Sequence, residues 1–516
     1  MTTGFDAASV GLYSQLLSSI AEEMGTVLER SSFSPNIKER RDYSCGLFTS
    51  SGLLAAQAAH IPVHLGAMEF LLQKWLADGP SIEAGRTYIS NDPFFAGTHL
   101  PDITFLRAVE VRGRIIGYVA NRAHHADVGG SSPGSFAPAP SVHEEGVLVR
   151  PQEATAELIA ELAGQMRNPK ERIGDLQAQA AANLVGADRL SSLANRWGDE
   201  FDERIAQCLA YSEAHTRNFL RSVPRGEWTA RESLDPLDDG EVLNICLRIE
   251  CDGNGGITFD FSGTSPLAPM GINATEAVTR SACYYVVRCL CSEAPANHGC
   301  FAPVSVNVPA GTILNAVYPA PVVAGNTETS QRTVDAILRT LQQALPDLAP
   351  ACSQGTMNNL ALGTDEWAYY ETIAGGAGGG PNRAGASAVH THMTNTRNTP
   401  IEAMEIELPV RFSRYEMRRG SGGDGVHSGG DGVIREFEVL EDEVTLSLMT
   451  ERRTSGPCGA QGGAPGSPGR NLLLRRGESR PLGSRDVVRL AQDDVVRIET
   501  PGGGGWGKPA ADAVLT

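Results

Sequence analysis

The chain has 516 residues, of which 41% are hydrophobic, so it can bury a large core and is too long for one ordinary domain. It carries 61 acidic against 43 basic residues, a formal net charge of −18 at pH 7. That charge disfavours nucleic acid and anionic membranes as partners. No apolar run approaches the roughly 20 residues of a membrane helix. The N-terminus shows no basic segment followed by an apolar one, so we expect a cytoplasmic protein without membrane contact.

Cysteine usage bears on the compartment, and glycine and proline usage bear on the fold. The ten cysteines include no C-x-x-C pair, which is typical of free thiols in a reducing compartment. With 57 glycines and 30 prolines, the chain should contain many turns around its core and should not form a helical bundle.

The first 90 residues predict a helix followed by a β-hairpin. Residues 6–29 carry apolar side chains at helical spacing. Strands are expected over 43–49 and 53–58, a short helix over 66–75 and a strand over 87–90. Counting across the hairpin with residue 50 opposite 53 places Asp42 opposite Ile61 and next to His60.

The stretch 91–130 predicts a second ribbon, with acidic and histidine side chains at its open end. Two apolar runs, 103–111 and 114–121, flank a tight turn at Arg112-Gly113. If Val111 pairs with Arg114, His124 falls opposite Pro101, beside His99 and Asp102. Cross-strand Cβ atoms lie about 4.5–5.5 Å apart, close enough for one divalent metal ion to bridge the three side chains. Such residues also cap turns at strand ends, so the spacing leaves both interpretations open.

Beyond this ribbon the pattern alternates between long helices and strands. Helices are expected over 175–197, with Asp175 as the N-cap, and over 200–221, 276–293 and 327–344. Strands are expected over 242–250, 257–261, 304–308, 433–440 and 444–449. The glycine-rich stretch 353–381 either approaches a ligand closely or forms a mobile surface loop.

The expected fold is therefore α+β, with hairpins and long helices in the N-terminal half and a β-rich C-terminal part. Three domains are expected, over residues 1–225, 226–404 and 405–516. The first should hold the metal site.

Two short motifs resemble known sites and fail on their chemistry. Residues 130–134 match G-x-S-x-G, but Pro133 lacks the backbone N–H that the oxyanion hole of such hydrolases needs. Residues 502–508, GGGGWGK, approach a phosphate loop, but Pro509 follows where a hydroxyl should bind Mg²⁺. The chain thus shows no nucleotide site of its own.

Taken together, the segments resemble the hydantoinase B / 5-oxoprolinase family over nearly the whole length. The matching pieces are SPNIKERRDYSCGLF (34–48), HIPVHLGAM (60–68), NDPFFAGTHLPDITF (91–105), NRAHHADVGG (121–130), RNPKERIGDLQAQ (167–179), DFSGTSP (260–266), PAPVVAGNTETSQR (319–332), YETIAGGAGGGP (370–381), VHTHMTNTRNTPIE (389–402) and TPGGGGWG (500–507). One departure is residues 425–432, where the family usually carries a basic residue in place of Val426 or His427.

The resemblance implies the B-type subunit of a two-component enzyme. A hydantoinase A-type partner, which binds ATP with Mg²⁺, would phosphorylate the carbonyl oxygen of a hydantoin, 5-oxoproline or another lactam. The B-type chain would then hydrolyse the activated cyclic amide in a hetero-oligomer. Two alternatives stay open: a subunit of an ATP-dependent ketone carboxylase, and a non-catalytic scaffold for the ATPase.

The resemblance also implies a set of site residues. The family's metal pattern falls on His99, Asp102 and His124, with Asp42 as the preferred fourth ligand. Zinc, iron(II) and manganese(II) all suit two nitrogens and two carboxylates. Glu39 is the alternative ligand or the general base. Further catalytic or substrate contacts are expected from His125, Asp127 and Glu145.

Overall fold

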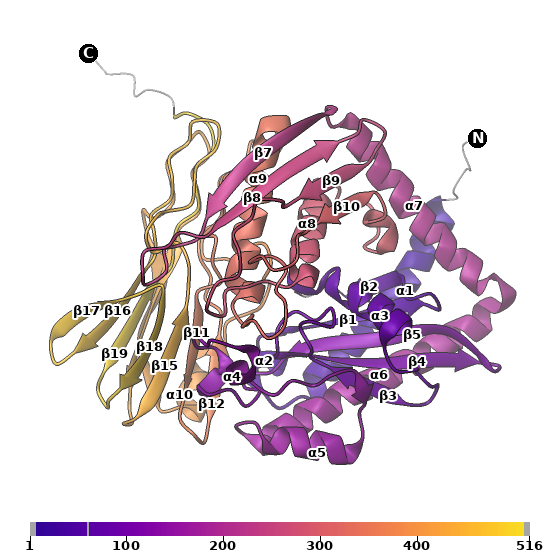
Figure 1. Ribbon diagram of the computed structural model, residues 1–516, viewed down its shortest axis with the longest axis horizontal. Coiled ribbons are helices and arrows are strands. Elements are labelled where there is room, and N and C mark those ends of the chain that lie inside the picture. The colour runs from indigo at the N-terminus through magenta and orange to yellow at the C-terminus, as the bar shows by residue number, and fades with distance from the viewer. Residues whose placement is uncertain (1–6, 59–60, 510–516) are drawn as a thin grey trace.

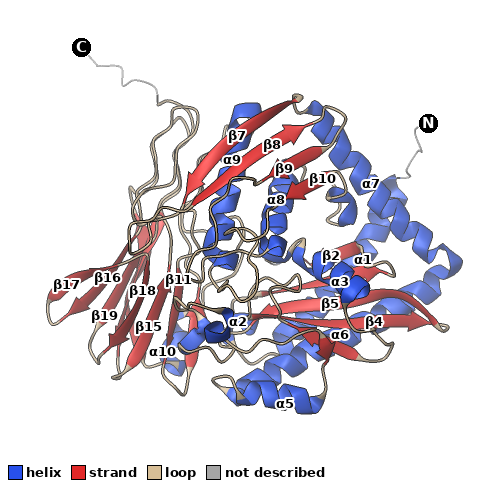
Figure 2. Ribbon diagram, in the orientation of Figure 1, coloured by secondary structure: helices blue, strands red, loops and turns tan. Residues whose placement is uncertain are grey.

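The computed structural model describes residues 7–58 and 61–509 and confirms the α+β class. Helices and a first sheet fill the N-terminal half, and strands dominate the C-terminal part (Figures 1 and 2). Short helices connect the larger elements: α2 Pro35–Lys38, α4 Val142–Glu145, α5 Ala156–Gly164 and α10 Ile401–Glu407.

A six-stranded sheet with the order β2-β1-β5-β4-β3-β6 forms the N-terminal half. Its strands are β1 Tyr43–Thr49, β2 Leu54–Ala58, β3 Thr87–Ser90, β4 Asp102–Val111, β5 Arg114–His124 and β6 Gln152–Glu153. Three long helices accompany them, α1 Ala7–Ser31, α6 Pro169–Trp197 and α7 Phe201–Ser222, and α3 Ala67–Asp78 is shorter. Apolar residues of α1 and α6 share a core with β1 and β5, while α3 packs with the other face. β1, β4 and β5 are therefore buried on both sides.

The β4–β5 ribbon carries a β-bulge that the sequence did not reveal. Val111 pairs with Arg114 as predicted, but the register shifts between Val109 and Glu110. A bulge sets two residues of one strand against one of the other. His124 therefore pairs with Asp102 and not with Pro101, which corrects the predicted register by one residue. Both side chains consequently point to the same face of the sheet.

The central part packs a four-stranded sheet, β10-β9-β8-β7, against two helices. The strands are β7 Gly226–Ser233, β8 Asn244–Cys251, β9 Ile257–Asp260 and β10 Val304–Asn307, and the helices are α8 Glu276–Leu290 and α9 Ser330–Ala344. A single π-helical turn, Gly325–Thr329, leads into α9. Such turns are rare and are frequent at functional sites.

The C-terminal part consists of two sheets that share one apolar core. The first has the order β12-β11-β15-β18, with β11 Asn359–Gly363, β12 Ala368–Glu371, β15 Val444–Met449 and β18 Arg485–Leu490. The second has the order β13-β14-β19-β16-β17, with β13 Val410–Arg418, β14 Gly432–Val439, β16 Arg470–Arg475, β17 Glu478–Leu482 and β19 Val495–Glu499. The first sheet combines strands from both sides of the boundary predicted at residue 404.

Two local predictions need correction. Of the two alternatives for the stretch 353–381, the mobile surface loop is wrong, because the stretch contains β11 and β12. Asp175 is not an N-cap, because α6 already begins at Pro169, a residue that the first helical turn accepts readily. Asp175 is buried inside the helix and accepts hydrogen bonds from the backbone of Phe33 and Ser34.

The glycine-rich segments pack against one another. Gly503 donates to the carbonyl of Gly430, and Gly430 donates to that of Ala377. A Cβ atom on Gly503 would lie 2.0 Å from the Ala377 oxygen, so only glycine permits this approach of three backbones.

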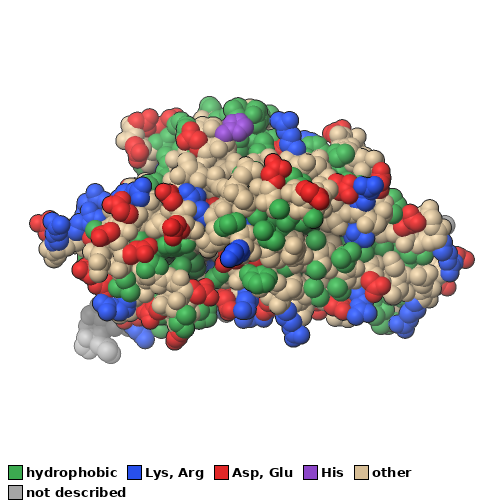
Figure 3. Space-filling model, turned by 90° about the horizontal axis from the view of Figure 1, so that it is seen from below, with side chains coloured by type: hydrophobic (Ala, Val, Ile, Leu, Met, Phe, Trp, Pro, Cys, Tyr) green, Lys and Arg blue, Asp and Glu red, His purple; other side chains and the backbone are tan. Residues whose placement is uncertain are grey.

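Within residues 7–58 and 61–509, no helix combines the length and apolar character needed to cross a membrane. Figure 3 shows acidic and basic side chains interspersed over one face of the molecule.

Candidate metal centre

A small buried cavity lies at the open end of the β4–β5 ribbon. Its volume is about 20 Å³, enough for a water molecule or an ion. The lining residues come from segments far apart in the sequence: Asp42, Ile61, Val63, His64, Asp102, His124, Asn326, Thr327, Met357, Tyr370, Thr372, Met393 and Thr394. Tertiary packing of all three parts of the chain therefore forms this cavity.

Three predicted ligands meet here in a regular triangle. His99 Nε2, Asp102 Oδ1 and His124 Nδ1 lie 3.2 Å from one another. Ligands on a tetrahedral ion with bonds of about 2.0 Å are separated by about 3.3 Å. Among the described residues, this is the one cluster of three or more His, Cys, Asp and Glu with metal-ligand spacing. The donor set and its spacing fit a divalent metal ion.

Neighbouring groups prepare these atoms for binding. His99 Nδ1 lies 2.7 Å from the Val323 carbonyl oxygen, which can only accept a hydrogen bond. The proton of the neutral ring is thus on Nδ1, and Nε2 presents a lone pair. His124 Nε2, the ring nitrogen that is not part of the triangle, is buried and has no protein partner in the described part of the chain. Such an unpaired buried nitrogen indicates an additional ligand or water.

The charges in the site favour a cation. Burial raises the pKa of Asp102, but His99 and His64 outweigh it and hold the pKa well below its usual range. Burial lowers the pKa of His99, but the Asp102 carboxylate reverses the shift and the net pKa is raised. Burial lowers the pKa of His124. A buried carboxylate that stabilises a proton on His99 also stabilises a metal ion in that proton's place.

Sequence reasoning missed the groups that orient Asp102. Its Oδ2 accepts from Thr98 Oγ1 at 2.6 Å and lies 3.3 Å from both His64 Nε2 and Asn326 Nδ2. Its Oδ1 is left to face His99 and His124. His64 is itself held by Ser44, at 3.0 Å from Nδ1. His64 lies in the HIPVHLGAM segment, and Asn326 lies on the π-helical turn before α9.

We expect His64→Ala to weaken metal binding about 10- to 100-fold, because Asp102 loses one of the partners that fix its orientation. Titration of the metal-free protein with zinc against a competing chelator measures the change. His215→Ala, on α7 outside the cavity, is the matched control and should bind zinc like the wild type. An unchanged zinc affinity in His64→Ala would contradict this role.

Asp42 lines the cavity, and Glu39 does not. Asp42 Oδ2 lies 3.7 Å from the guanidinium of Arg40, which also donates to the carbonyl of Tyr370. The Tyr370 ring stacks on His124 with centroids 4.5 Å apart. Arg40 thereby ties the predicted fourth ligand to the aromatic wall of the site. His60 lies outside the described residues.

His125 and Asp127 lie outside the cavity, and we assign neither a catalytic step. Strand alternation turns His125 away from His124, and its Nε2 lies 2.9 Å from Gln179 Oε1. Asp127 accepts hydrogen bonds from the backbone of Gly129, Gly134 and Arg167 and pairs with the Arg167 guanidinium. It therefore fixes the loop that follows β5.

Glu145 is buried behind His99 and is tied to the backbone. Its carboxyl oxygens accept from the amides of Val322 and Val323, and the Val323 carbonyl in turn binds His99. Glu145 does not line the cavity, and its substrate contact stays a prediction. Its contacts position His99.

Glu145 should make stability depend on pH. Burial raises the pKa of Glu145 to about 8, although the hydrogen bonds from the Val322 and Val323 amides act to lower it. Between about pH 4.5 and 8 the folded chain keeps a proton that the unfolded chain releases, so the free energy of unfolding falls as pH rises through this window. From pH 5 to 8, the melting temperature of Glu145→Gln should fall less than that of the wild type. The control Glu161→Gln, which replaces an exposed residue, should show the same fall as the wild type. Equal falls in wild type and Glu145→Gln would contradict the assignment.

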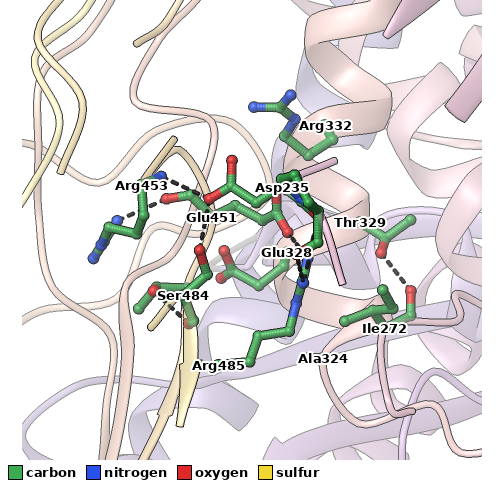
Figure 4. Close-up of polar contacts among 12 residues, drawn as sticks. Asp235, Ile272, Ala324, Glu328, Thr329, Arg332, Glu451, Arg453, Ser484 and Arg485 are labelled. Carbon is green, nitrogen blue, oxygen red and sulfur yellow. Dashed lines mark hydrogen bonds and ion pairs between the residues drawn. The ribbon is translucent and has the colours of Figure 1, made fainter. Parts of the chain in front are cut away.

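Buried charged side chains, among them Asp235, Glu328 and Glu451, form a network of polar contacts (Figure 4). Asp235 accepts from Ser484 and from the Arg453 backbone, and Glu451 pairs with Arg485. Burial raises the pKa of Glu328 in this network to about 8. Glu328 accepts from Asn359, whose amide oxygen accepts from the Tyr370 hydroxyl. The network thus fixes Tyr370 against His124.

Known proteins are similar to this chain in sequence. The chain matches the Hydantoinase B/oxoprolinase family over residues 6–509. 5-oxoprolinase 1 of Arabidopsis thaliana is 38% identical, and the match covers 97% of this chain and 42% of that protein. The putative B-type subunit of a D-/L-hydantoinase from Pseudomonas sp. (strain NS671) is 29% identical, with 96% and 88% covered. The chain thus spans less than half of the plant protein and nearly the whole bacterial one.

Solved structures share the fold. The ATP-dependent caprolactamase from Pseudomonas jessenii superposes with a TM-score of 0.89 at 25% identity, covering 98% of this chain and 91% of the other. A nucleotide-free acetone carboxylase chain superposes with a TM-score of 0.88 at 16% identity, covering 98% and 76%. The family match over residues 6–509 establishes that this chain belongs to the Hydantoinase B/oxoprolinase family.

Proposed function

We propose that this chain is the metal-binding B-type subunit of an ATP-dependent amidohydrolase that opens a cyclic amide. A separate hydantoinase A-type subunit phosphorylates the carbonyl oxygen, and this chain completes the hydrolysis. The observation that carries the proposal is the 3.2 Å triangle of His99 Nε2, Asp102 Oδ1 and His124 Nδ1 beside a small cavity that Asp102 and His124 line. The partner is supported by the Pseudomonas relative, which is named as one subunit of a hydantoinase.

The chain's residues have separate roles in this proposal. His99, Asp102 and His124 hold a zinc, iron or manganese ion, with Asp42 as the fourth ligand. Such an ion lowers the pKa of a bound water toward about 7. The Val323 carbonyl and Glu145 keep His99 in place, and Thr98 and His64 keep Asp102 in place. Tyr370, Met357 and Met393 shield the site from bulk water, which protects an activated intermediate.

Substrate entry requires movement in this scheme. A cavity of about 20 Å³ cannot hold a lactam ring, so part of its wall must shift. Met357 and Met393 line it, and methionine side chains adapt their shape readily. Phosphorylation of the carbonyl oxygen turns a poor electrophile into one with a good leaving group, which gives the partner its role before hydrolysis.

A second candidate, ATP-dependent carboxylation of a ketone, is favoured by the fold shared with acetone carboxylase. The two reactions differ in their co-substrate. A carboxylase needs bicarbonate, and a cyclic amide hydrolase does not.

Co-expression with an A-type chain tests the proposal. The complex is incubated with ATP and 5-oxoproline, a hydantoin, caprolactam or acetone, with and without bicarbonate, and the ring-opened or carboxylated product is measured together with ADP. We expect a ring-opened product without bicarbonate. Product that forms only from a ketone with bicarbonate would replace hydrolysis by carboxylation. Full activity of the complex with His124→Ala would indicate that this chain is a non-catalytic scaffold for the ATPase.

A further inference from the structure

A second and much larger cavity lies across one segment from the metal centre. Its volume is about 610 Å³, within the range of small-ligand sites. His390, Thr391 and His392 line this cavity, and the next two residues, Met393 and Thr394, line the metal cavity. The segment 390–394 thus separates the two spaces.

The walls of the large cavity differ in chemistry. Tyr285, Val286 and Leu290 of α8 and Leu338 of α9 form an apolar wall. Ser353, the glycine-rich residues Ala377, Gly378 and Gly380, and the segment 390–392 form the other wall, which is more polar. No Asp or Glu of the described chain lines it, although the protein carries a net charge of −18. A cavity without carboxylates in so acidic a protein favours an anionic ligand.

One cation stands at the mouth. Arg383 lines the cavity and is exposed, and its guanidinium has no ion-pair or hydrogen-bonding partner among residues 7–58 and 61–509. Burial lowers the pKa of His390 to about 4 and also lowers that of His392. Arg383 is therefore the formal positive charge of this cavity at neutral pH.

Buried polar atoms on the polar wall lack partners. The His392 side chain is 8% exposed and Thr391 is 6% exposed. His392 Nε2 and Thr391 Oγ1 have no hydrogen-bonding partner in the described chain. Asp335 Oδ1, itself without a hydrogen bond among the described residues, lies 3.9 Å from His392 Nε2, and Asp335 Oδ2 pairs with Arg452. The His392 backbone adopts φ 55°, a left-handed conformation that is uncommon outside glycine. Unpaired buried groups on such a segment indicate a ligand that completes them.

We propose that this cavity binds a small organic carboxylate. Arg383 holds the carboxylate group, since its planar fork matches the two oxygens, and the α8–α9 wall holds the apolar body. Thr391 and His392 supply further polar contacts. The link to a product rests on the proposed function: opening a cyclic amide creates a carboxylate on an aliphatic chain, so the ligand is of the same chemical class as the reaction product.

Calorimetric titration of the purified chain with hexanoate tests this, without ATP or partner. We expect saturable 1:1 binding, weakened about 10-fold or more in Arg383→Gln. As a control, Arg480→Gln, which replaces an exposed arginine on β17, should bind hexanoate like the wild type. Hexylamine should not bind. As a check on location, hexanoate should slow alkylation of Cys289, an exposed thiol that lines this cavity.

Three results would overturn the proposal: no saturable binding of hexanoate, equal affinity in wild type and Arg383→Gln, or unchanged alkylation of Cys289. Tighter binding of hexyl phosphate than of hexanoate would overturn the carboxylate assignment in favour of a phosphate ester. The measurement uses neither turnover nor the partner. Failure of the proposed ring-opening activity would therefore leave this result intact.

Discussion

Replacing His124 by alanine should remove the bound metal and lower ring-opening activity by about 1000-fold or more. The substitution deletes one corner of the 3.2 Å donor triangle. Its place is buried, with His124 3% exposed, so solvent cannot readily supply a replacement ligand. Metal content by inductively coupled plasma mass spectrometry and product formation by the co-expressed complex report the two effects separately.

His125→Gln is the matched control, because His125 is the next residue and points to the other face of the sheet, toward Gln179. It should retain the metal. Wild-type metal content and activity in His124→Ala would exclude the catalytic account, and loss of metal in both variants would indicate general damage to the strand end.

Replacing Arg452 by leucine should lower the free energy of unfolding by about 3–5 kcal/mol. Arg452 is 2% exposed and pairs with Asp335 and Glu232, which are also buried. Glu232 keeps its ion pairs with Arg332 and Arg339, but Asp335 keeps, within residues 7–58 and 61–509, only His392 at 3.9 Å. An uncompensated buried carboxylate is what makes the substitution severe. Urea unfolding followed by circular dichroism measures the loss.

Arg189→Leu provides the contrast. Arg189 pairs with Glu23 between α6 and α1 on the surface, where water screens the charges, and we expect wild-type unfolding. If Arg452→Leu also unfolded like the wild type, the buried network would not be stabilising the contact between α9 and the C-terminal sheets.

Local patterns were sufficient to predict most elements and to bring the three proposed metal ligands together. Alternation of apolar residues placed β4 and β5, and the tight turn brought His99, Asp102 and His124 to one end. The exact register was wrong by one residue, because a bulge inserts a residue without disturbing the apolar pattern enough to be seen. The bulge places Asp102 directly opposite His124.

The rest of the site depends on contacts between distant segments. Asn326 lies 224 positions from Asp102 in the sequence, and Tyr370 lies on β12 beyond a second sheet. No periodicity links such residues, so neither was predicted. His64 stands only a few residues after β2, but its contact with Asp102 depends on how the 3₁₀ turn at 62–64 packs. From the sequence alone, the glycine-rich stretch 353–381 stays open between two alternatives for the same reason: its close packing against residues 430 and 503 depends on segments that are distant in the sequence.

The most direct test of the metal centre is an anomalous difference map from crystals of the metal-loaded chain, recorded at the absorption edge of the bound metal. The account predicts one peak about 2.0–2.2 Å from His99 Nε2, Asp102 Oδ1 and His124. A map without density there, with His99 and His124 bonded only to protein groups, would contradict it.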